Sequence, residues 1–253
     1  MRLNELDAKM RCFEISNDFE ILPEIYMIAR LDGRGFTKLT KEIHPYKKPF
    51  DLEFSNLMVE TSKHLMNCGF HILYAYTQSD EISLLFHKKE TAFSRKTRKY
   101  ISILAGEASA KFSLLLGSTG VFDCRISQLP HRELVMDYFR WRSEDALRNS
   151  LNAYCYWKLR EENKTATQAF DFVKGMSISN KNEFLFKRGI NFNDLPLWQK
   201  RGIGIYWKTF EKKWINKDIS KEVITKQREL IINQELPMKE KYFNLLNDII
   251  PFT

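Results

Sequence analysis

The stretch "FHILYAYTQSDEISLLFHK", residues 70–88, decides the fold. Two apolar runs, 70–78 and 81–88, flank Ser79 and Asp80. Runs of this length predict strands, and Ser-Asp is typical of a turn, so the stretch predicts a β-hairpin. Asp80 and Glu81 are unusual there, because carboxylates are poor strand formers and unpaired buried charge is costly. A turn explains them, and so does a metal site completed by a carboxylate elsewhere in the chain.

The segments on either side place this hairpin in a larger unit. An apolar run at 24–32 predicts a strand that ends at Asp32-Gly33, and helical spacing predicts a helix at 50–68. After the hairpin, 92–117 predicts a long helix and 121–130 a short strand. The order β-α-β-β-α-β is the split βαβ, or ferredoxin-like, arrangement.

The remaining residues predict a different kind of structure. We expect helices at 133–163, 165–173 and 181–189, and paired strands at 202–215 and 220–233. The chain has no Gly/Ser-rich linker. We therefore expect an α+β fold in which 1–132 form a catalytic core and 133–253 form a helical and β-hairpin elaboration packed on it. Together the two parts are expected to form one structural unit.

Composition limits the class of protein. The chain has 253 residues, 43% hydrophobic and 28% charged, with no apolar run of membrane-helix length and no signal peptide at its acidic N-terminus. Its four scattered cysteines suit reduced thiols, so we expect a soluble cytoplasmic protein with no membrane partner. The net charge of +8, with basic clusters at 47–50, 87–100 and 208–214 that also carry aromatic residues, favours a nucleic acid or polyphosphate ligand. A basic surface that serves only solubility is the alternative.

The predicted topology suggests why the acids are present. In a split βαβ sheet the first strand lies beside the hairpin, so Asp32 and Asp80 can meet at one end of the sheet. Carboxylate, carbonyl and phosphate oxygens are the ligands that Mg²⁺ prefers, and two such ions support phosphoryl displacement in polymerases and nucleotide cyclases alike. The glycines of "LDGRGF" (31–36) allow the backbone to approach a triphosphate, although Asp-Gly alone is also typical of a turn.

Several motifs together are specific to one family. They are "RLDGRGF" (30–36), "KKPFD" (47–51), "YTQSDEIS" (76–83), "FDCR" (122–125), "DYFRWR" (137–142) and "KNEFLFKRGINFNDLP" (181–196). In these motifs and their order, over most of residues 1–207, the chain resembles the tRNA-His guanylyltransferase family, the 3′-to-5′ nucleotide-adding polymerases with a polymerase-like palm.

The resemblance implies roles for individual residues. Two Mg²⁺ ions would be held by Asp32, the Gly33 carbonyl and Asp80, with Glu81 in catalytic support. The triphosphate of the incoming nucleotide would be held by backbone groups of Gly33, Arg34, Gly35 and Phe36. Positions linked to activation or nucleotide binding are matched by Lys48, Ser79, Lys181 and Asn191. Further phosphate contacts are expected from Lys96, Lys99 and Arg125, and RNA contacts from Arg30, Lys208, Lys212 and Lys213.

One block departs from the family pattern. Eukaryotic members that add the extra guanosine to tRNA-His carry "HINNLYNT", whereas this chain has "ALRNSLNA" at 146–153, with Ala146 in place of the histidine. In this respect it is similar to the bacterial and archaeal paralogues. The resemblance then implies template-dependent 3′-to-5′ repair of truncated tRNA, with tRNA, ATP, GTP and other nucleoside triphosphates as partners, in a homotetramer. The alternatives are G−1 addition to tRNA-His, a nucleotide cyclase, and a non-catalytic RNA-binding protein.

Overall fold

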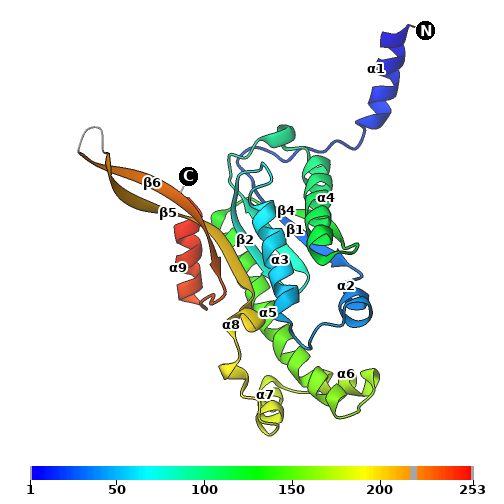
Figure 1. Ribbon diagram of the computed structural model, residues 1–253. Coiled ribbons are helices and arrows are strands. Elements are labelled where there is room, and N and C mark those ends of the chain that lie inside the picture. The colour runs from blue at the N-terminus through cyan, green and yellow to red at the C-terminus, as the bar shows by residue number, and fades with distance from the viewer. Residues whose placement is uncertain (1, 217–220, 252–253) are drawn as a thin grey trace.

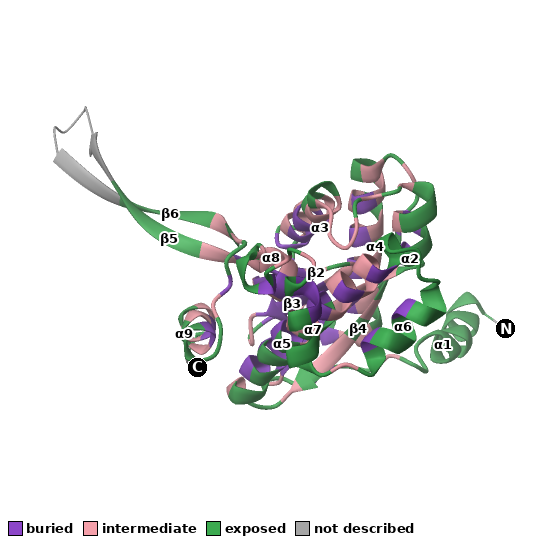
Figure 2. Ribbon diagram, turned by 90° about the horizontal axis from the view of Figure 1, so that it is seen from below, coloured by how far each residue is buried: buried purple, intermediate pink, exposed green. Residues whose placement is uncertain are grey.

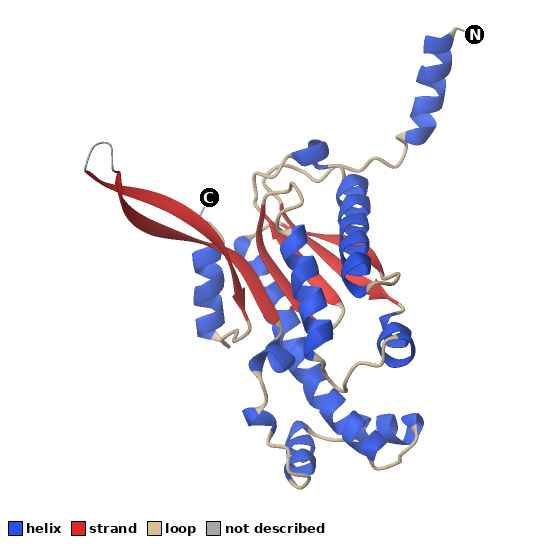
Figure 3. Cartoon of the chain, viewed as in Figure 1, coloured by secondary structure: helices blue, strands red, loops and turns tan. Residues whose placement is uncertain are grey.

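The computed structural model describes residues 2–216 and 221–251, except for the side chains of residues 213–216 and 221–224. The described residues form one six-stranded sheet in the order β4-β1-β3-β2-β5-β6, antiparallel throughout, with helices on both faces (Figures 1 and 3). The strands are β1 Tyr26–Arg34, β2 Ile72–Gln78, β3 Glu81–Phe86, β4 Val121–Leu129, β5 Ile203–Asn216 and β6 Lys221–Asn233. The helices are α1 Leu3–Glu14, α2 Phe36–Lys38, η1 Leu39–Ile43, α3 Leu52–Leu65, η2 Ala92–Arg95, α4 Thr97–Leu116, α5 Arg132–Glu161, α6 Ala166–Lys174, α7 Ile178–Phe186, η3 Phe192–Asp194, α8 Leu197–Arg201 and α9 Glu240–Ile249.

The element order predicted for the first half is confirmed, and β1 lies beside the β2–β3 hairpin as expected. Several element boundaries differ, including the following two. The strand β1 runs two residues past Asp32, because Gly33 and Arg34 still pair with Phe122 and Val121 of β4. The predicted helix 92–117 is broken, because residues 93–95 have positive φ angles of 53°, 52° and 57°. The helices α1, α8 and α9 were not predicted.

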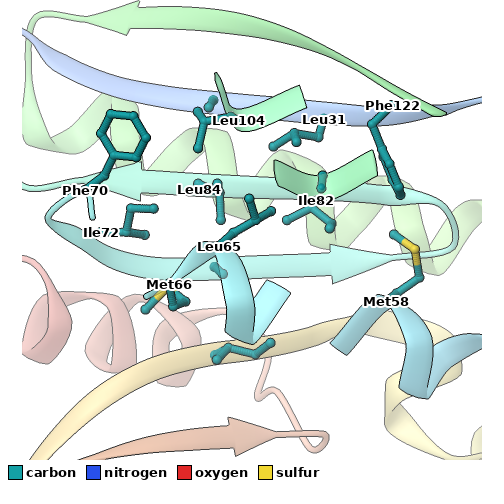
Figure 4. Packing of buried hydrophobic residues seen from close by; sticks show 14 of the residues in the cluster. Leu31, Met58, Leu65, Met66, Phe70, Ile72, Ile82, Leu84, Leu104 and Phe122 are labelled. Atoms are coloured by element: carbon teal, nitrogen blue, oxygen red, sulfur yellow. The ribbon is translucent and has the colours of Figure 1, made fainter. Parts of the chain in front are cut away.

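The sheet separates two apolar layers because side chains alternate along each strand. From β1, Met27, Ala29 and Leu31 enter the layer beneath α3 and α4, which Figure 4 shows from close by. Tyr26 and Ile28 point to the other face, where α5 and α9 cover them. Both faces of β1 are therefore buried, which fixes its register against β3 and β4.

Local capping signals set the helix ends near the acids. The Asp51 carboxylate accepts from the backbone N–H groups of Glu53 and Phe54, at 2.7 and 3.2 Å, and so caps the start of α3. Gly117, with φ +76°, ends α4 through a 2.9 Å bond from its N–H to the Ser113 carbonyl. Because β4 follows within a few residues, the end of α4 lies close to the end of β1.

The predicted C-terminal strand pair is present, and it joins the sheet through β5, which pairs with β2. Its far part extends from the body as a two-stranded arm (Figures 1 and 2). Within the described residues, no helix combines the length and apolar character needed to cross a bilayer. The cysteines Cys12, Cys68, Cys124 and Cys155 are free.

Candidate active site

The two acids predicted to meet do lie at one end of the sheet. Asp32 of β1 stands opposite Glu81 of β3, and Asp80 occupies the hairpin turn directly before Glu81. The Gly33 N–H donates to the Asp80 carbonyl at 3.1 Å, which fixes the turn against β1. Ser79 adopts a positive φ of 54° in this turn. The backbone of two segments far apart in sequence therefore holds both carboxylates in place.

The electrostatic environment of Asp80 disfavours its charged form. Burial raises the pKa of the Asp80 carboxyl, and the negative charges of Asp32 and Glu81 raise this pKa further, against a hydrogen bond from the Ser79 hydroxyl. The cation beside Asp32 is Arg125, whose Nη2 lies 3.8 Å from Oδ2 and 3.3 Å from Asp123. The site thus concentrates negative charge, which a bound cation would stabilise.

The oxygen donors suit a hard cation. Among the residues that the structure describes, no three His, Cys, Asp or Glu side chains gather as a metal cluster. The protein carboxylates at this point are those of Asp32 and Asp80, next to the Gly33 backbone. A set of one or two carboxylates completed by substrate phosphates and water is the usual mode for Mg²⁺, so the residues present fit such an ion.

Glu81 has a different environment from the other two acids. Its Oε2 accepts from the Arg142 guanidinium of α5, and its Oε1 lies 4.0 Å from Nη1 of Arg30. Arg142 also lies 3.5 Å from Asp145 and over the Trp141 ring. The carboxylate of Glu81 is therefore neutralised by arginines, which favours a supporting role over direct metal binding. The Arg30 side chain is only 18% exposed and lies 4.0 Å from Glu81, so its position does not favour the predicted RNA contact.

The glycine turn after Asp32 is tied to the hydrophobic core. Phe36 is buried against Phe54, Phe112 and Phe122. A Cβ on Gly33 would lie 2.5 Å from the Phe36 ring, so only glycine fits there. Of the predicted triphosphate contacts, Phe36 can therefore offer only its backbone, while Arg34 is exposed at the end of β1.

A cavity of about 180 Å³, here called the inner cavity, lies on one side of Asp80. Its lining includes Thr40, Lys41, Tyr46, Lys48, Asp51, Phe54, Ser79, Asp80 and Trp198. Lys48 donates to the Thr40 carbonyl at 2.9 Å. Burial lowers the pKa of Lys48, and the charge of Lys41 lowers this pKa further. A phosphate placed beside these lysines would gain a poorly hydrated cation as its partner.

A more open cleft of about 350 Å³, here called the acid cleft, lies on the other side. Its lining includes Asp32, Asp80, Glu81, Arg142, Asp145, Ala146, Asn149, Ser150 and Ala153. The inner cavity and the acid cleft share Pro49, Phe50, Gln78, Ser79 and Asp80. Asp80 thus stands in the wall between two compartments. Ala146, at the position of the altered family block, is buried in the lining of this cleft.

A third hollow, the basic groove, continues from the acid cleft through the shared residues Asn149 and Ala153. It measures about 640 Å³ and is lined by Lys41, Arg148, Asn149, Asn152, Ala153, Tyr156, Trp157, Phe170, Val173, Lys174 and Lys181. Lys41 and Lys48 lie over the Trp157 ring, at 5.3 and 5.9 Å from its centre. Four cations and three aromatic rings suit a polynucleotide or polyphosphate. Lys181, for which a nucleotide contact is predicted, is one of these four cations.

Lys96 and Lys99, two residues predicted to contact phosphates, lie far from the two acids. Lys96 precedes α4 and pairs with Asp18 at 2.9 Å, and Lys99 lies over the Phe93 ring. The C-terminal end of α4 lies near the acids, and its 20 residues span about 30 Å. Lys96 and Lys99 therefore stand near the start of α4, at the opposite end of the sheet (Figure 1), and this position does not support a contact with a nucleotide at Asp80.

Asn191 is also apart from the acids. Its side-chain amide donates to Asp194 at 2.8 Å and lines a separate hollow with Ser179, Asn182 and Phe186. This position does not support a contact with a nucleotide at Asp80. On the arm, Lys208 and Lys212 are exposed, as an RNA contact requires, whereas the side chain of Lys213 lies outside the described part of the chain.

Two protein-family models and several known proteins match this chain. A family model described as tRNAHis guanylyltransferase matches residues 7–130, and one described as Thg1 C terminal domain matches residues 133–250. The tRNA(His) guanylyltransferase of Schizosaccharomyces pombe is 32% identical over 239 residues, which cover 86% of this chain and 91% of that protein. The chain belongs to the tRNA-His guanylyltransferase family. It is accordingly a nucleotidyltransferase.

Further members of the guanylyltransferase family also match this chain. The probable tRNA(His) guanylyltransferase of Mus musculus is 31% identical, with 84% of this chain and 76% of that protein covered. A bacterial tRNA(His) guanylyltransferase-like protein solved in complex with GTP matches with a TM-score of 0.75 and 26% identity, over 98% of this chain and all of that one. The Saccharomyces cerevisiae enzyme, at 24% identity and a TM-score of 0.70 over 84% of this chain and 93% of that one, shares the fold.

Sequence reasoning missed one residue of this guanylyltransferase-family site. Arg142 lies 61 positions from Glu81 along the chain, yet donates to its carboxylate. The motif "DYFRWR" contained Arg142, but the motif carried no sign of its partner. The alternation of β3 places Glu81 on the face that α5 covers, and that was the available signal.

Proposed function

We propose that this enzyme adds nucleotides to the 5′ end of truncated tRNA in the 3′-to-5′ direction, with base pairing to the opposite strand selecting each nucleotide. The observation that carries the proposal is the position of Asp80 between the inner cavity and the acid cleft. A nucleoside triphosphate and an RNA end can approach the same carboxylates from opposite sides. The strand order β4-β1-β3-β2 supports a ferredoxin-like palm over 1–132, elaborated by 133–253.

The reaction forms one P–O bond and breaks another. The 3′-hydroxyl oxygen of the nucleoside triphosphate attacks the activated 5′ phosphorus of the RNA, and the hydroxyl proton passes to water. Pyrophosphate leaves from a triphosphate end, and AMP leaves from an end first adenylated by ATP. The incoming triphosphate then becomes the new 5′ end. Two bound Mg²⁺ ions would activate the hydroxyl and stabilise the charge on the attacking and the leaving oxygens.

The residues of the chain supply the rest. Asp32, Asp80 and the Gly33 carbonyl would hold the two Mg²⁺ ions, and the backbone from Gly33 to Phe36 would hold triphosphate oxygens. Lys48 and Ser79, beside the inner cavity, and Lys181, in the basic groove, would bind phosphates during activation. The Ser150 hydroxyl, which lines the acid cleft without a hydrogen-bond partner, can bind a ligand there.

The side chain at position 146 supports selection by pairing. Ala146 lines the acid cleft beside Asp80, so a methyl group stands where the specialised relatives place an imidazole. The methyl group of Ala146 offers no hydrogen bond by which one base could be told from another. We also propose that the enzyme is located in the cytoplasm and assembles as a homotetramer.

G−1 addition to tRNA-His is a second candidate, because the curated relatives carry the name tRNA(His) guanylyltransferase. Truncated tRNAs of several identities, each with all four bases opposite the missing nucleotide, separate the two. We expect incorporation to follow the opposing base and to vary little with the anticodon. Addition of G alone, and only to tRNA-His, would overturn the repair proposal in favour of the second candidate.

The same assay tests the remaining classes. Release of pyrophosphate from nucleotide in the absence of RNA would indicate a cyclase. RNA binding with no turnover of any nucleotide would indicate a non-catalytic binding protein. Ala146→His is the variant to compare with the parent protein, and we expect its choice of incorporated nucleotide to depend less on the opposing base.

A further inference from the structure

The N-terminal helix α1 stands away from the body of the protein (Figures 1 and 3). None of its residues is buried. Its large apolar side chains are exposed: Leu3 by 79%, Leu6 by 40%, Met10 by 55% and Phe13 by 67%. A lone helix of 12 residues is marginal in water, since helices of this length depend on a packed apolar face. The apolar face of α1 therefore has no packing partner within the described part of the chain.

The apolar residues of α1 follow the spacing of a coiled coil. The intervals between Leu3, Leu6, Met10 and Phe13 are three, four and three residues. This is the a-d-a-d pattern of two heptads, with Leu3 and Met10 at a and with Leu6 and Phe13 at d. The stripe is as narrow as a two-helix seam and narrower than the face that a helix buries on a globular core. The partner is therefore another helix.

The charged residues that flank the seam indicate which helix is the partner of α1. Both g positions are basic, Arg2 and Lys9, and both e positions are acidic, Asp7 and Glu14. In a parallel pair of identical helices, each g residue meets the e residue five positions later on the other helix. Arg2 then meets Asp7 of the second copy, and Lys9 meets Glu14 of the second copy. An antiparallel pair would instead oppose g with g and e with e, which places like charges together.

Other occupants fit less well. The side-chain charges of residues 2–14 sum to zero, with basic Arg2, Lys9 and Arg11 against acidic Glu5, Asp7 and Glu14. A helix without net charge is a poor ligand for RNA phosphates or an anionic lipid surface. The chain that leaves α1 is held at Asp18, which pairs with Lys96 and Arg98 of the body. This clamp directs α1 outward, away from its own sheet.

We propose that α1 is a pairing helix, which binds α1 of a second copy of this chain in parallel and in register. Two heptads make a weak contact alone, so the pair acts together with other contacts between the two bodies, at high effective concentration. The parallel arrangement also requires that both bodies lie at the same end of the helix pair. The proposal does not depend on the enzymatic reaction.

Disulfide trapping of the full-length protein tests both orientation and register. In a Cys12→Ser background, Leu6→Cys places thiols opposite each other at the d layer of a parallel pair. We expect a disulfide-linked dimer to form under mild oxidation. The control is Ala8→Cys, on the outer face of the helix, which should stay monomeric on a denaturing gel. Equal trapping at both sites would overturn the proposal.

Mixed trapping separates the two orientations. A size-tagged Leu6→Cys protein is oxidised together with Met10→Cys protein after exchange of subunits. A parallel pair yields the two homotypic products, whereas an antiparallel pair joins position 6 to position 10. A predominantly heterotypic product would overturn the parallel assignment.

Charge reversal provides an independent test. Asp7→Lys/Glu14→Lys makes both flanks basic, and Arg2→Glu/Lys9→Glu makes both flanks acidic. We expect either variant alone to self-associate at least about 10-fold more weakly in sedimentation experiments, and an equimolar mixture to recover association. Unchanged association of each variant, with no preference for the mixed species, would contradict the proposed pairing.

Discussion

Arg142 of α5 donates to the carboxylate of Glu81, and Glu81 stands opposite Asp32 in the sheet. A helix from the C-terminal half of the chain therefore holds a side chain beside the two acids. Arg142 and Glu81 are mostly buried, with side chains 11% and 23% exposed. The remaining cation near Glu81 is Arg30, at 4.0 Å. This pair therefore connects the two halves of the chain beside the site.

Arg142→Gln should destabilise the protein by about 2–3 kcal/mol, because it leaves Glu81 partly buried without its main partner. Adding Glu81→Gln should recover part of this loss, since the unpaired charge is then removed. Urea unfolding of the two single variants and the double variant measures their coupling. Strictly additive losses would contradict the role of Arg142 as the partner of Glu81.

Asp80→Asn should abolish nucleotidyl transfer, by more than about 100-fold, because it removes a ligand of the proposed ions. The control is Asp123→Asn: Asp123 lies opposite Asp32 on β4, is exposed, and should be replaceable with little loss. Single-turnover rates in Mg²⁺ measure both effects. Near-normal turnover by the Asp80 variant would remove Asp80 from the site.

The same Asp80→Asn variant should gain stability when no metal is present. Burial and the charge of Asp32 raise the pKa of Asp80 above the ordinary value of 3.8, so ionisation opposes folding. The stability that protonated Asp80 contributes is complete below the unfolded pKa and is lost as pH rises through the folded pKa. The advantage of the variant should therefore appear above about pH 4 and grow until Asp80 is ionised. Thermal unfolding in chelator across this range checks it, and a variant less stable than the parent at neutral pH would refute it.

Gly33→Ala should cost about 1–3 kcal/mol of stability and most of the activity, because the added methyl group would lie 2.5 Å from the buried Phe36 ring. Gly106→Ala is the matched control. Gly106 is exposed on α4, with no atom within 4 Å of an added Cβ, so alanine should stabilise that helix by up to about 1 kcal/mol. Chemical denaturation of both variants decides whether the effect belongs to the position or to the substitution.

Lys48→Ala and Lys181→Ala should impair addition to 5′-monophosphorylated tRNA by about 10-fold or more, and addition to 5′-triphosphorylated tRNA less, because they bind phosphates during activation. Lys99→Ala is the control, since Lys99 lies at the far end of the sheet. Equal losses on the two substrates would assign both lysines to general phosphate binding instead.

The sequence predicted those parts of the site that depend on strand alternation and short turns. Asp32 and Asp80 meet because β1 must pair beside the hairpin, and this follows from the order of elements. The distance of Lys96 and Lys99 from the acids was not foreseen, because their charge was considered without the direction of α4. A helix of 20 residues separates its ends by about 30 Å, so the choice of end decides what a lysine can reach.

Contacts between distant segments were beyond the sequence. The pairing of Arg142 with Glu81 depends on how α5 crosses the sheet, and no local pattern encodes that crossing. The burial of Arg30, expected as an RNA contact, was not foreseen for the same reason, because it follows from the position of Arg30 beside Glu81 under α5. The pattern of α1, in contrast, was present in residues 2–14 and needed the structure only to show that nothing in the body covers it.

The shared wall at Asp80 has a kinetic consequence. Under the proposed function, the nucleotide and the RNA end occupy separate compartments on the two sides of this wall. Here one compartment can be emptied and refilled while the neighbouring one stays occupied. The polymer can then remain bound from one cycle to the next, and the number of nucleotides added per encounter is set by how fast the RNA dissociates relative to each round of reloading.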